Sequence, residues 1–119
     1  MNTRTRPIQC CVAPSAPVTI SDNERGHWLS SFRALSDPTR FDIFLLVAGQ
    51  DAPLCACDVG SRYELTQPTI SHHMKSLAEA GLIDVSRQGV WAYYQLSVQG
   101  RQVLGGMLRS SEVELFEAR

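Results

Sequence analysis

Four cysteines, arranged in two close pairs, are the residues of this chain whose type and spacing best suit chemistry. Cys55 and Cys57 stand one residue apart in the stretch PLCACDV, and Cys10 and Cys11 are adjacent near the N-terminus. A single cysteine is often only a small buried apolar side chain. Two close pairs among prolines and polar residues instead indicate thiols that bind a soft ion or exchange electrons.

The composition bounds the setting in which these thiols work. A chain of 119 residues, 44% of them hydrophobic, suits one small domain with one core. It has no apolar run near the roughly 20 residues that span a bilayer, and its N-terminus lacks the apolar stretch of a secretory signal. We therefore predict a cytoplasmic protein without a membrane partner, in a compartment that keeps cysteines as thiols rather than as structural disulfides.

The first 20 residues differ in composition from the rest of the chain. Residues 1–20 contain Pro7, Pro14 and Pro17 and few large apolar side chains. This composition predicts a flexible N-terminal arm, which carries both adjacent cysteines. Residues 21–119 are predicted to form the folded domain.

Two helices are predicted at the start of the folded part. Either Ser21 or Asp22 is placed to cap the first helix, in which apolar residues recur at helical spacing: Trp28, Leu29, Phe32 and Leu35. In the second helix Asp37 is the cap and Pro38 occupies the first turn. The apolar run FDIFLLV that follows predicts a largely buried helix, which Gly49 ends.

The second half of the chain has the signals of a helix-turn-helix followed by a hairpin. A short helix is predicted to open near Cys55, and Thr66 caps the segment QPTISHHMKSLAEAG, which Gly81 closes. The stretch LIDVSRQGVWAYYQL alternates on both sides of a Gln-Gly turn, as β-hairpins do. A last helix is expected from Val98, although a Gly-Gly pair disfavours it. The order predicts a mainly α fold with a β-hairpin wing (α+β), a winged helix-turn-helix.

The helix after Thr66 has an apolar stripe and a polar face. Ile70, Met74 and Leu77 share the stripe, and short polar side chains with one cation face the other way, as major-groove reading requires. Because the net charge is −1, any DNA contact must come from such a local cluster. The candidate DNA-binding residues of this face and of the hairpin tip are Gln67, Thr69, Ser71, His72, Lys75, Arg87 and Gln88. A merely solvated helix face is the alternative, and the hairpin behind it favours DNA.

The two adjacent histidines of this helix are expected to have different roles. His73 lies nearer the apolar stripe than His72 does, which predicts a partly buried, hydrogen-bonded histidine that contributes to packing. Neighbouring residues of a helix point about 100° apart. The two imidazoles are therefore poorly placed to chelate one ion.

Several ordered motifs resemble the ArsR/SmtB family of metal- and metalloid-sensing repressors. They are FRALSDPTRFDIFLLV, LCACDV and LTQPTISHHMKSLAEAGLIDVSRQGVWAYYQL, and the resemblance covers about residues 28–108. It implies a winged helix-turn-helix homodimer whose first and last helices form the dimer interface, so that residues 21–119 are the DNA-binding and dimerisation domain. It also implies a repressor that binds operator DNA and releases it when an inducing ion binds.

The resemblance implies different ligand sets, which this sequence meets unequally. The family site on the last helix needs histidine. The histidines of this sequence are His27, His72 and His73, and none of them falls in the predicted last helix, so this site is absent. The Cys-x-Cys-x-x-Cys site has Gly60 at its third position. In two further variants, cysteines of the N-terminal arm bind the ion together with cysteines of the short helix. In one variant, two separated arm cysteines act with both thiols of the Cys-x-Cys. In the other, an adjacent arm pair acts with a single helix cysteine of the other subunit.

The residues favour a soft ion held by thiolates. Soft ions select sulfur, and a helix N-terminus lowers the pKa of a thiol such as Cys55. The adjacent pair matches the arsenite-responsive variant, so we predict trivalent arsenic or antimony as inducer, held by Cys10, Cys11 and Cys55. Whether Cys57 is a further ligand stays open at this point. With it, a four-thiolate cadmium or lead site is the alternative. The arsenic- or antimony-responsive repressor is expected to derepress metalloid-resistance genes.

Three other interpretations stay open at this point. A repressor of the same fold could sense oxidants through its thiols. A thiol enzyme such as an arsenate reductase is disfavoured, because Cys-x-x-Cys and a glycine-rich phosphate loop are missing. A dimeric interaction module without DNA is the simplest alternative. We predict no enzymatic activity and no organic cofactor.

Overall fold

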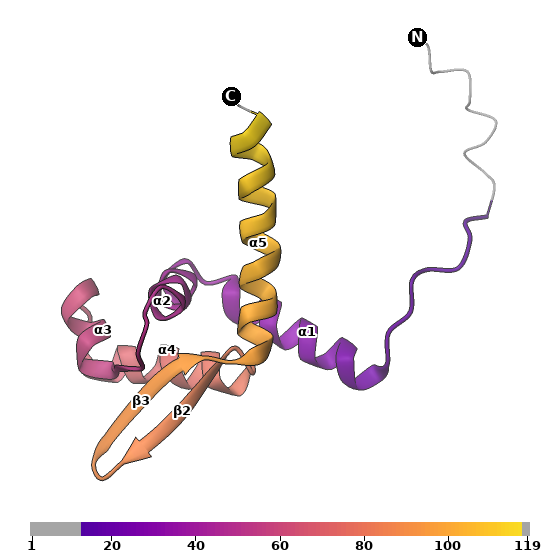
Figure 1. Ribbon diagram of the computed structural model, residues 1–119. Coiled ribbons are helices and arrows are strands. Elements are labelled where there is room, and N and C mark those ends of the chain that lie inside the picture. The colour runs from indigo at the N-terminus through magenta and orange to yellow at the C-terminus, as the bar shows by residue number, and fades with distance from the viewer. Residues whose placement is uncertain (1–12, 118–119) are drawn as a thin grey trace.

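The computed structural model describes the backbone of residues 13–117 and the side chains of residues 13–109, so Cys10 and Cys11 lie outside it. Within these bounds the predicted order of elements is confirmed (Figure 1). The helices and strands are α1 (Asp22–Leu35), α2 (Pro38–Ala48), β1 (Leu54–Cys55), α3 (Ala56–Tyr63), α4 (Gln67–Glu79), β2 (Ile83–Gln88), β3 (Trp91–Leu96) and α5 (Val98–Glu117).

Side-chain caps fix where three of the helices begin. The backbone N–H of Glu24 donates to the Ser21 hydroxyl at 3.1 Å, and the Glu24 carboxylate accepts in return, which completes a capping box. The Asp37 carboxylate accepts the N–H of Arg40 at 2.9 Å at the start of α2. Thr66 accepts the N–H of Thr69 at 3.4 Å at the start of α4. All three predicted caps are therefore present.

The wing is a three-stranded antiparallel sheet with the strand order β1-β3-β2. The predicted hairpin turns at Gly89, which has a φ of 63°, a conformation that glycine adopts at no steric cost. The sequence did not predict β1, in which Leu54 pairs with Tyr94 and Cys55 with Tyr93. This short strand ties the start of α3 to the wing.

The core lies where α2, α3 and α4 meet the base of the wing. Its fully buried side chains include Ile43, Phe44, Val59, Ile70, Met74, Leu77 and Leu82. The predicted apolar stripe of α4 is thus confirmed as the buried face. Burial of such side chains contributes about 1.5–3 kcal/mol each, so the core fixes the polar face of α4 toward solvent.

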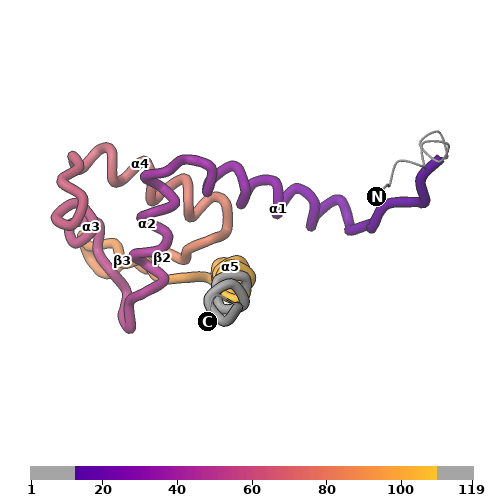
Figure 2. Tube along the Cα trace, turned by 90° about the horizontal axis from the view of Figure 1, so that it is seen from above, coloured from indigo at the N-terminus to yellow at the C-terminus, as the bar shows by residue number. Residues whose placement is uncertain are grey.

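The two terminal helices project from this core. Figure 1 shows α5 rising from the end of the wing, and Figure 2 shows α1 extending away from the cluster of α2, α3 and α4. The Gly-Gly pair does not interrupt α5, because Val103, Leu104 and Met107 pack against the core and outweigh the low helix propensity of glycine. None of the helices in the described part of the chain is long and apolar enough to cross a membrane.

Polar contacts join the N-terminus of α5 and the C-terminal half of α1 to the end of α4. The Ser31 hydroxyl, fully buried, donates to the carbonyl of Ala80 at 3.3 Å and accepts a hydrogen bond from the Gln99 amide. The Ser97 hydroxyl donates to the carbonyl of Gly81 at 2.6 Å. At this junction α5 approaches the backbone closely at Gly100, where an added Cβ would overlap the carbonyl oxygen of Leu82.

This contact predicts opposite effects for two glycines of α5. Gly100→Ala should lower the free energy of unfolding by about 1–3 kcal/mol, the usual range for overpacking. Gly105→Ala is the matched control, because a Cβ there meets nothing within 4 Å, and it should raise the free energy by about 0.5–1 kcal/mol. Urea unfolding followed by circular dichroism measures both, and equal effects would contradict the close approach.

Candidate nucleic-acid interface and thiol site

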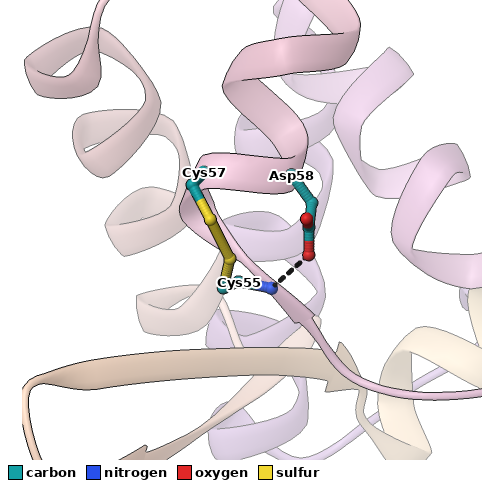
Figure 3. A group of neighbouring side chains, drawn as sticks. All are labelled: Cys55, Cys57 and Asp58. Carbon is teal, nitrogen blue, oxygen red and sulfur yellow. Dashed lines mark hydrogen bonds between the residues drawn. A yellow bond between two sulfur atoms is a disulfide. The ribbon is translucent and has the colours of Figure 1, made fainter.

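The chain turns from strand to helix at Cys55, and this turn positions the thiol pair. Cys55 is the last residue of β1 and the N-cap of α3. Its backbone N–H donates to the Asp58 carboxylate at 3.1 Å, as Figure 3 shows. The Cys55 side chain is buried and that of Cys57 is exposed. The predicted helix opening at Cys55 is therefore confirmed.

Cys55 and Cys57 are joined by a disulfide (Figure 3). This differs from the prediction that both remain free thiols. The strand-to-helix turn brings their Cα atoms to 5.4 Å, which lies within the range that disulfides span. The same turn means that reduction leaves two thiols side by side.

The residues at this turn supply part of a soft-ion site. One sulfur each of Cys55 and Cys57 and one carboxylate oxygen of Asp58 lie within 4.8 Å of one another. Asp58 already accepts the Cys55 N–H, and its hard oxygen suits a soft ion poorly. A Cβ at Gly60 would contact Leu65 and Ile70, so that position faces α4 rather than the sulfurs. The turn therefore offers two sulfur ligands, and a third must come from elsewhere.

All seven predicted DNA-binding side chains are exposed. They come from α4 and from the tip of the wing: Gln67, Thr69, Ser71, His72, Lys75, Arg87 and Gln88. The Thr69 hydroxyl also accepts from the Thr66 hydroxyl at 2.9 Å, so it takes part in the cap of α4. Lys75 is the only lysine of the sequence.

A groove of about 730 Å³ runs between α4 and the wing. Gln67, Ser71 and Lys75 line its α4 side, and Arg87 lines the wing side. Arg87 pairs with Ala92, next to the Gln88–Trp91 pair that ends the hairpin, so Arg87 lies just before the tip of the wing and lines the groove. Both cysteines of the disulfide line the same groove. This placement could not be predicted from the sequence, because it depends on β1, which has no sequence signal.

The groove also contains residues that the sequence analysis did not select. Four of them are apolar or aromatic side chains of the wing: Val85, Val90, Trp91 and Tyr94. Glu79 adds one anion near the end of α4. The alternation of the hairpin placed these residues in strands, but only the position of the wing over α4 shows that they face the thiols.

His73 is partly buried, as predicted, but its expected hydrogen bond is missing at Nδ1. That atom is buried and has no hydrogen-bond partner in the described part of the chain. Burial lowers the pKa of His73, opposed by Asp37 and assisted by Arg40 and His72. The pKa of Asp37 is also lowered, chiefly because its carboxylate accepts the Arg40 backbone N–H.

The lowered pKa of His73 predicts a pH-dependent stability. A group whose pKa is lower in the folded state stabilises the fold above its unfolded value, here 6.5, and this stabilisation is lost as the pH falls through the folded pKa. His73→Gln should therefore flatten the loss of unfolding free energy below neutral pH. His27→Gln is the control and should keep the wild-type slope, because the exposed His27 lies on α1 and is not among the groups that act on His73. Thermal unfolding between neutral pH and about 5, within the range where histidine titrates, measures this, and identical slopes for all three proteins would refute the assignment. Asp37 does not interfere, because its pKa is lowered from the usual carboxyl value, away from the range in which histidine titrates.

Comparison with protein families and known proteins gives a consistent result. The family model described as "Bacterial regulatory protein, arsR family" matches residues 37–85. "Arsenic resistance transcriptional regulator ArsR1" of Pseudomonas putida is 40% identical over 78 residues, which are 66% of this chain and 60% of that protein. The "Transcriptional repressor SdpR" of Bacillus subtilis is 39% identical over 66 residues, 56% of this chain and 71% of that protein.

The "Arsenical resistance operon repressor" of Escherichia coli is 41% identical over 66 residues, 56% of each chain. The chain thus spans about three fifths of the length of the arsenic-related relatives that it matches.

Solved structures confirm the winged helix-turn-helix fold. HlyU from Vibrio cholerae superimposes with a TM-score of 0.63 at 21% identity, covering 76% of this chain and 96% of that one. The homodimeric winged helix-turn-helix DNA-binding domain Mb0332 from Mycobacterium bovis gives a TM-score of 0.65 at 19% identity, covering 87% and 96%.

Proposed function

Because this chain belongs to the arsR family of bacterial regulatory proteins, we propose that it is a homodimeric repressor that releases operator DNA when trivalent arsenic or antimony binds its cysteine thiolates. The observation that carries the proposal is that Cys55 and Cys57 line the same groove as Gln67 and Lys75 of α4. An ion held by these thiols would therefore lie beside the residues proposed to contact DNA.

The exposed face of α4 supports double-stranded DNA as the partner. Thr66 caps α4, and the exposed Gln67 lies in the first turn, at the positive end of the helix dipole. Ser71, His72 and Lys75 follow on exposed positions of the next turns. Lys75 and Arg87 stand on opposite walls of the groove, which suits a phosphate backbone running between α4 and the wing. Operator DNA as the partner places the proposed activity in the cytoplasm.

Exposed apolar side chains on the projecting helices support a dimer. Phe32 of α1 is 59% exposed and Leu108 of α5 is 50% exposed. Trp28 stacks on Phe32 with ring centroids 6.0 Å apart. Side chains of this kind on two helices that leave the core suit an interface with a second copy. Residues 21–119 would then be the DNA-binding and dimerisation domain, with residues 1–20 as the arm that brings Cys10 and Cys11.

The thiol count supports the choice of ion. Trivalent arsenic takes three sulfur ligands, and the turn at Cys55 supplies at most two. The arm pair Cys10 and Cys11, which lies outside the described residues, would complete the arsenic site with Cys55. Cys57 would be a fourth ligand in the cadmium or lead alternative. The disulfide must be opened first, because a sulfur in a disulfide is not a thiolate ligand. The role is that of a binding protein, without enzymatic turnover and without an organic cofactor.

Release of DNA needs only a modest coupling between the two sites. A coupling of about 1–3 kcal/mol changes affinity 5- to 150-fold, and it is reciprocal, so operator DNA should weaken ion binding by the same factor. Ion binding at the first turn of α3 would order the arm and shift α3 with α4, which pack directly against each other.

The DNA contact of Lys75 is tested by its salt dependence. Lys75→Gln should weaken operator binding uniformly across sequences and reduce the slope of log K against log salt by about 2 for the dimer, because each subunit loses one phosphate contact. Arg101→Gln is the control, because Arg101 is an exposed cation of α5 outside the groove. Fluorescence anisotropy with an inverted-repeat duplex measures both, and an unchanged slope for Lys75→Gln would contradict the proposed interface.

Operator release by arsenite tests the ion site. In reducing buffer, Cys55→Ser should bind operator with wild-type affinity but fail to release it with arsenite. Cys57→Ser distinguishes the ions, since release should persist with arsenite and be lost with cadmium or lead if those ions need four thiolates. The readout is anisotropy with arsenite, antimonite, cadmium and lead in turn. Full release of Cys55→Ser by arsenite would overturn the site.

A further inference from the structure

The groove between α4 and the wing has an apolar wall that DNA contacts do not explain. Val90 is 90% exposed, Trp91 is 54% exposed and Val85 is 44% exposed, and all three line the groove. Phosphates and base edges are contacted mostly by polar and cationic side chains. Large apolar side chains left exposed together indicate a binding surface.

This wall stands in the same groove as the thiol pair. Cys55 and Cys57 line one part of the groove, and Cys57 is exposed. Tyr94, half-buried, pairs with Val85 on β2 and with Leu54, the neighbour of Cys55 in β1. Soft-ion ligands and an apolar surface are therefore combined in a single groove of about 730 Å³, within the range of small-molecule sites.

We propose that this groove binds trivalent arsenicals that carry one organic substituent, with arsenic on Cys55 and Cys57 and the substituent against Val85, Val90 and Trp91. The proposal rests on the proposed function and names a ligand class for the same site. Arsenic in such a compound makes one bond to carbon and keeps two for sulfur. Two sulfurs are what the turn at Cys55 offers, and Gly60 supplies no third. Inorganic arsenite, in contrast, needs a third thiolate.

The binding step involves no change in oxidation state of arsenic. A dihydroxy arsenical exchanges both hydroxyl groups for the two sulfurs, each thiol gives up its proton, and two water molecules leave. The Cys55–Cys57 disulfide must be reduced beforehand. A phosphine or a small thiol supplies the two electrons, and two protons complete the dithiol.

The number of thiols needed separates the two kinds of ligand. Phenylarsine oxide and arsenite are titrated calorimetrically, in competition with a small dithiol, into the reduced full-length protein without DNA. Cys10→Ser/Cys11→Ser should keep the wild-type affinity for phenylarsine oxide and lose about tenfold or more for arsenite. Equal losses for both ligands, or no loss for either, would overturn the proposal.

The apolar wall is tested on the same ligands. Trp91→Ala should weaken phenylarsine oxide about five- to tenfold, as expected from partial burial of a phenyl ring, and leave arsenite unchanged. Val90→Ser, at the most exposed position of the wall, should act in the same direction if Trp91→Ala is poorly folded. Val98→Ala is the control, since Val98 is 70% exposed but lies outside the groove. Equal effects of Trp91→Ala on both ligands, or none, would refute the wall.

Operator release, measured on the same samples, keeps the two proposals apart. If arsenite does not release operator from the wild-type protein, the proposed function fails. The proposal that the groove binds organic arsenicals is tested only by the affinities for phenylarsine oxide and arsenite. Release by arsenite together with phenylarsine oxide binding that requires Cys10 and Cys11 would retain the proposed function and overturn this inference.

Discussion

The strand-to-helix turn at Cys55 is the constraint on which the site depends. One residue pairs with Tyr93 in the wing and also caps α3, with its N–H held by Asp58. The backbone at this point cannot move without disturbing either a β ladder or a helix start. Because α3 leads into α4 through only a few residues, Glu64 to Thr66, the wing, the thiols and α4 are fixed relative to one another.

The cap of α4 and the burial of its apolar side chains also fix the orientation of α4. Thr66 begins α4, and its buried residues Ile70, Met74 and Leu77 anchor it in the core. A helix anchored along one stripe must present the opposite stripe to solvent. The polar face of α4 is therefore oriented by apolar residues that touch no ligand, and the hairpin completes a groove whose two walls come from different elements.

The sequence predicted the elements well and the site only in part. Caps such as Ser21, Asp37 and Thr66 are local, because a side chain bonds to a backbone group three residues away, so the sequence alone contains the signal. The pairing of Cys55 with Tyr93 joins residues far apart in the chain, and a strand of two residues has no periodicity to detect. The combination of thiols with Arg87 and Trp91 follows from that pairing and was therefore missed. The Cys55–Cys57 disulfide was missed for a different reason. Free thiols were predicted because the expected compartment is reducing, and the geometry of the turn did not enter that prediction.

A shared groove has a consequence for how ion and DNA would influence each other. When two sites are distant, coupling needs an element with two discrete arrangements between them. Here Cys57, Gln67 and Lys75 line one surface, so an arsenic atom and its substituent would occupy space beside a DNA strand without any relay. This direct route would act in addition to the proposed shift of α3 with α4, because the turn at Cys55 keeps a bound ligand next to α4. Under the proposed function, larger substituents on arsenic should then displace DNA more effectively than small ones, through the volume that they fill next to α4.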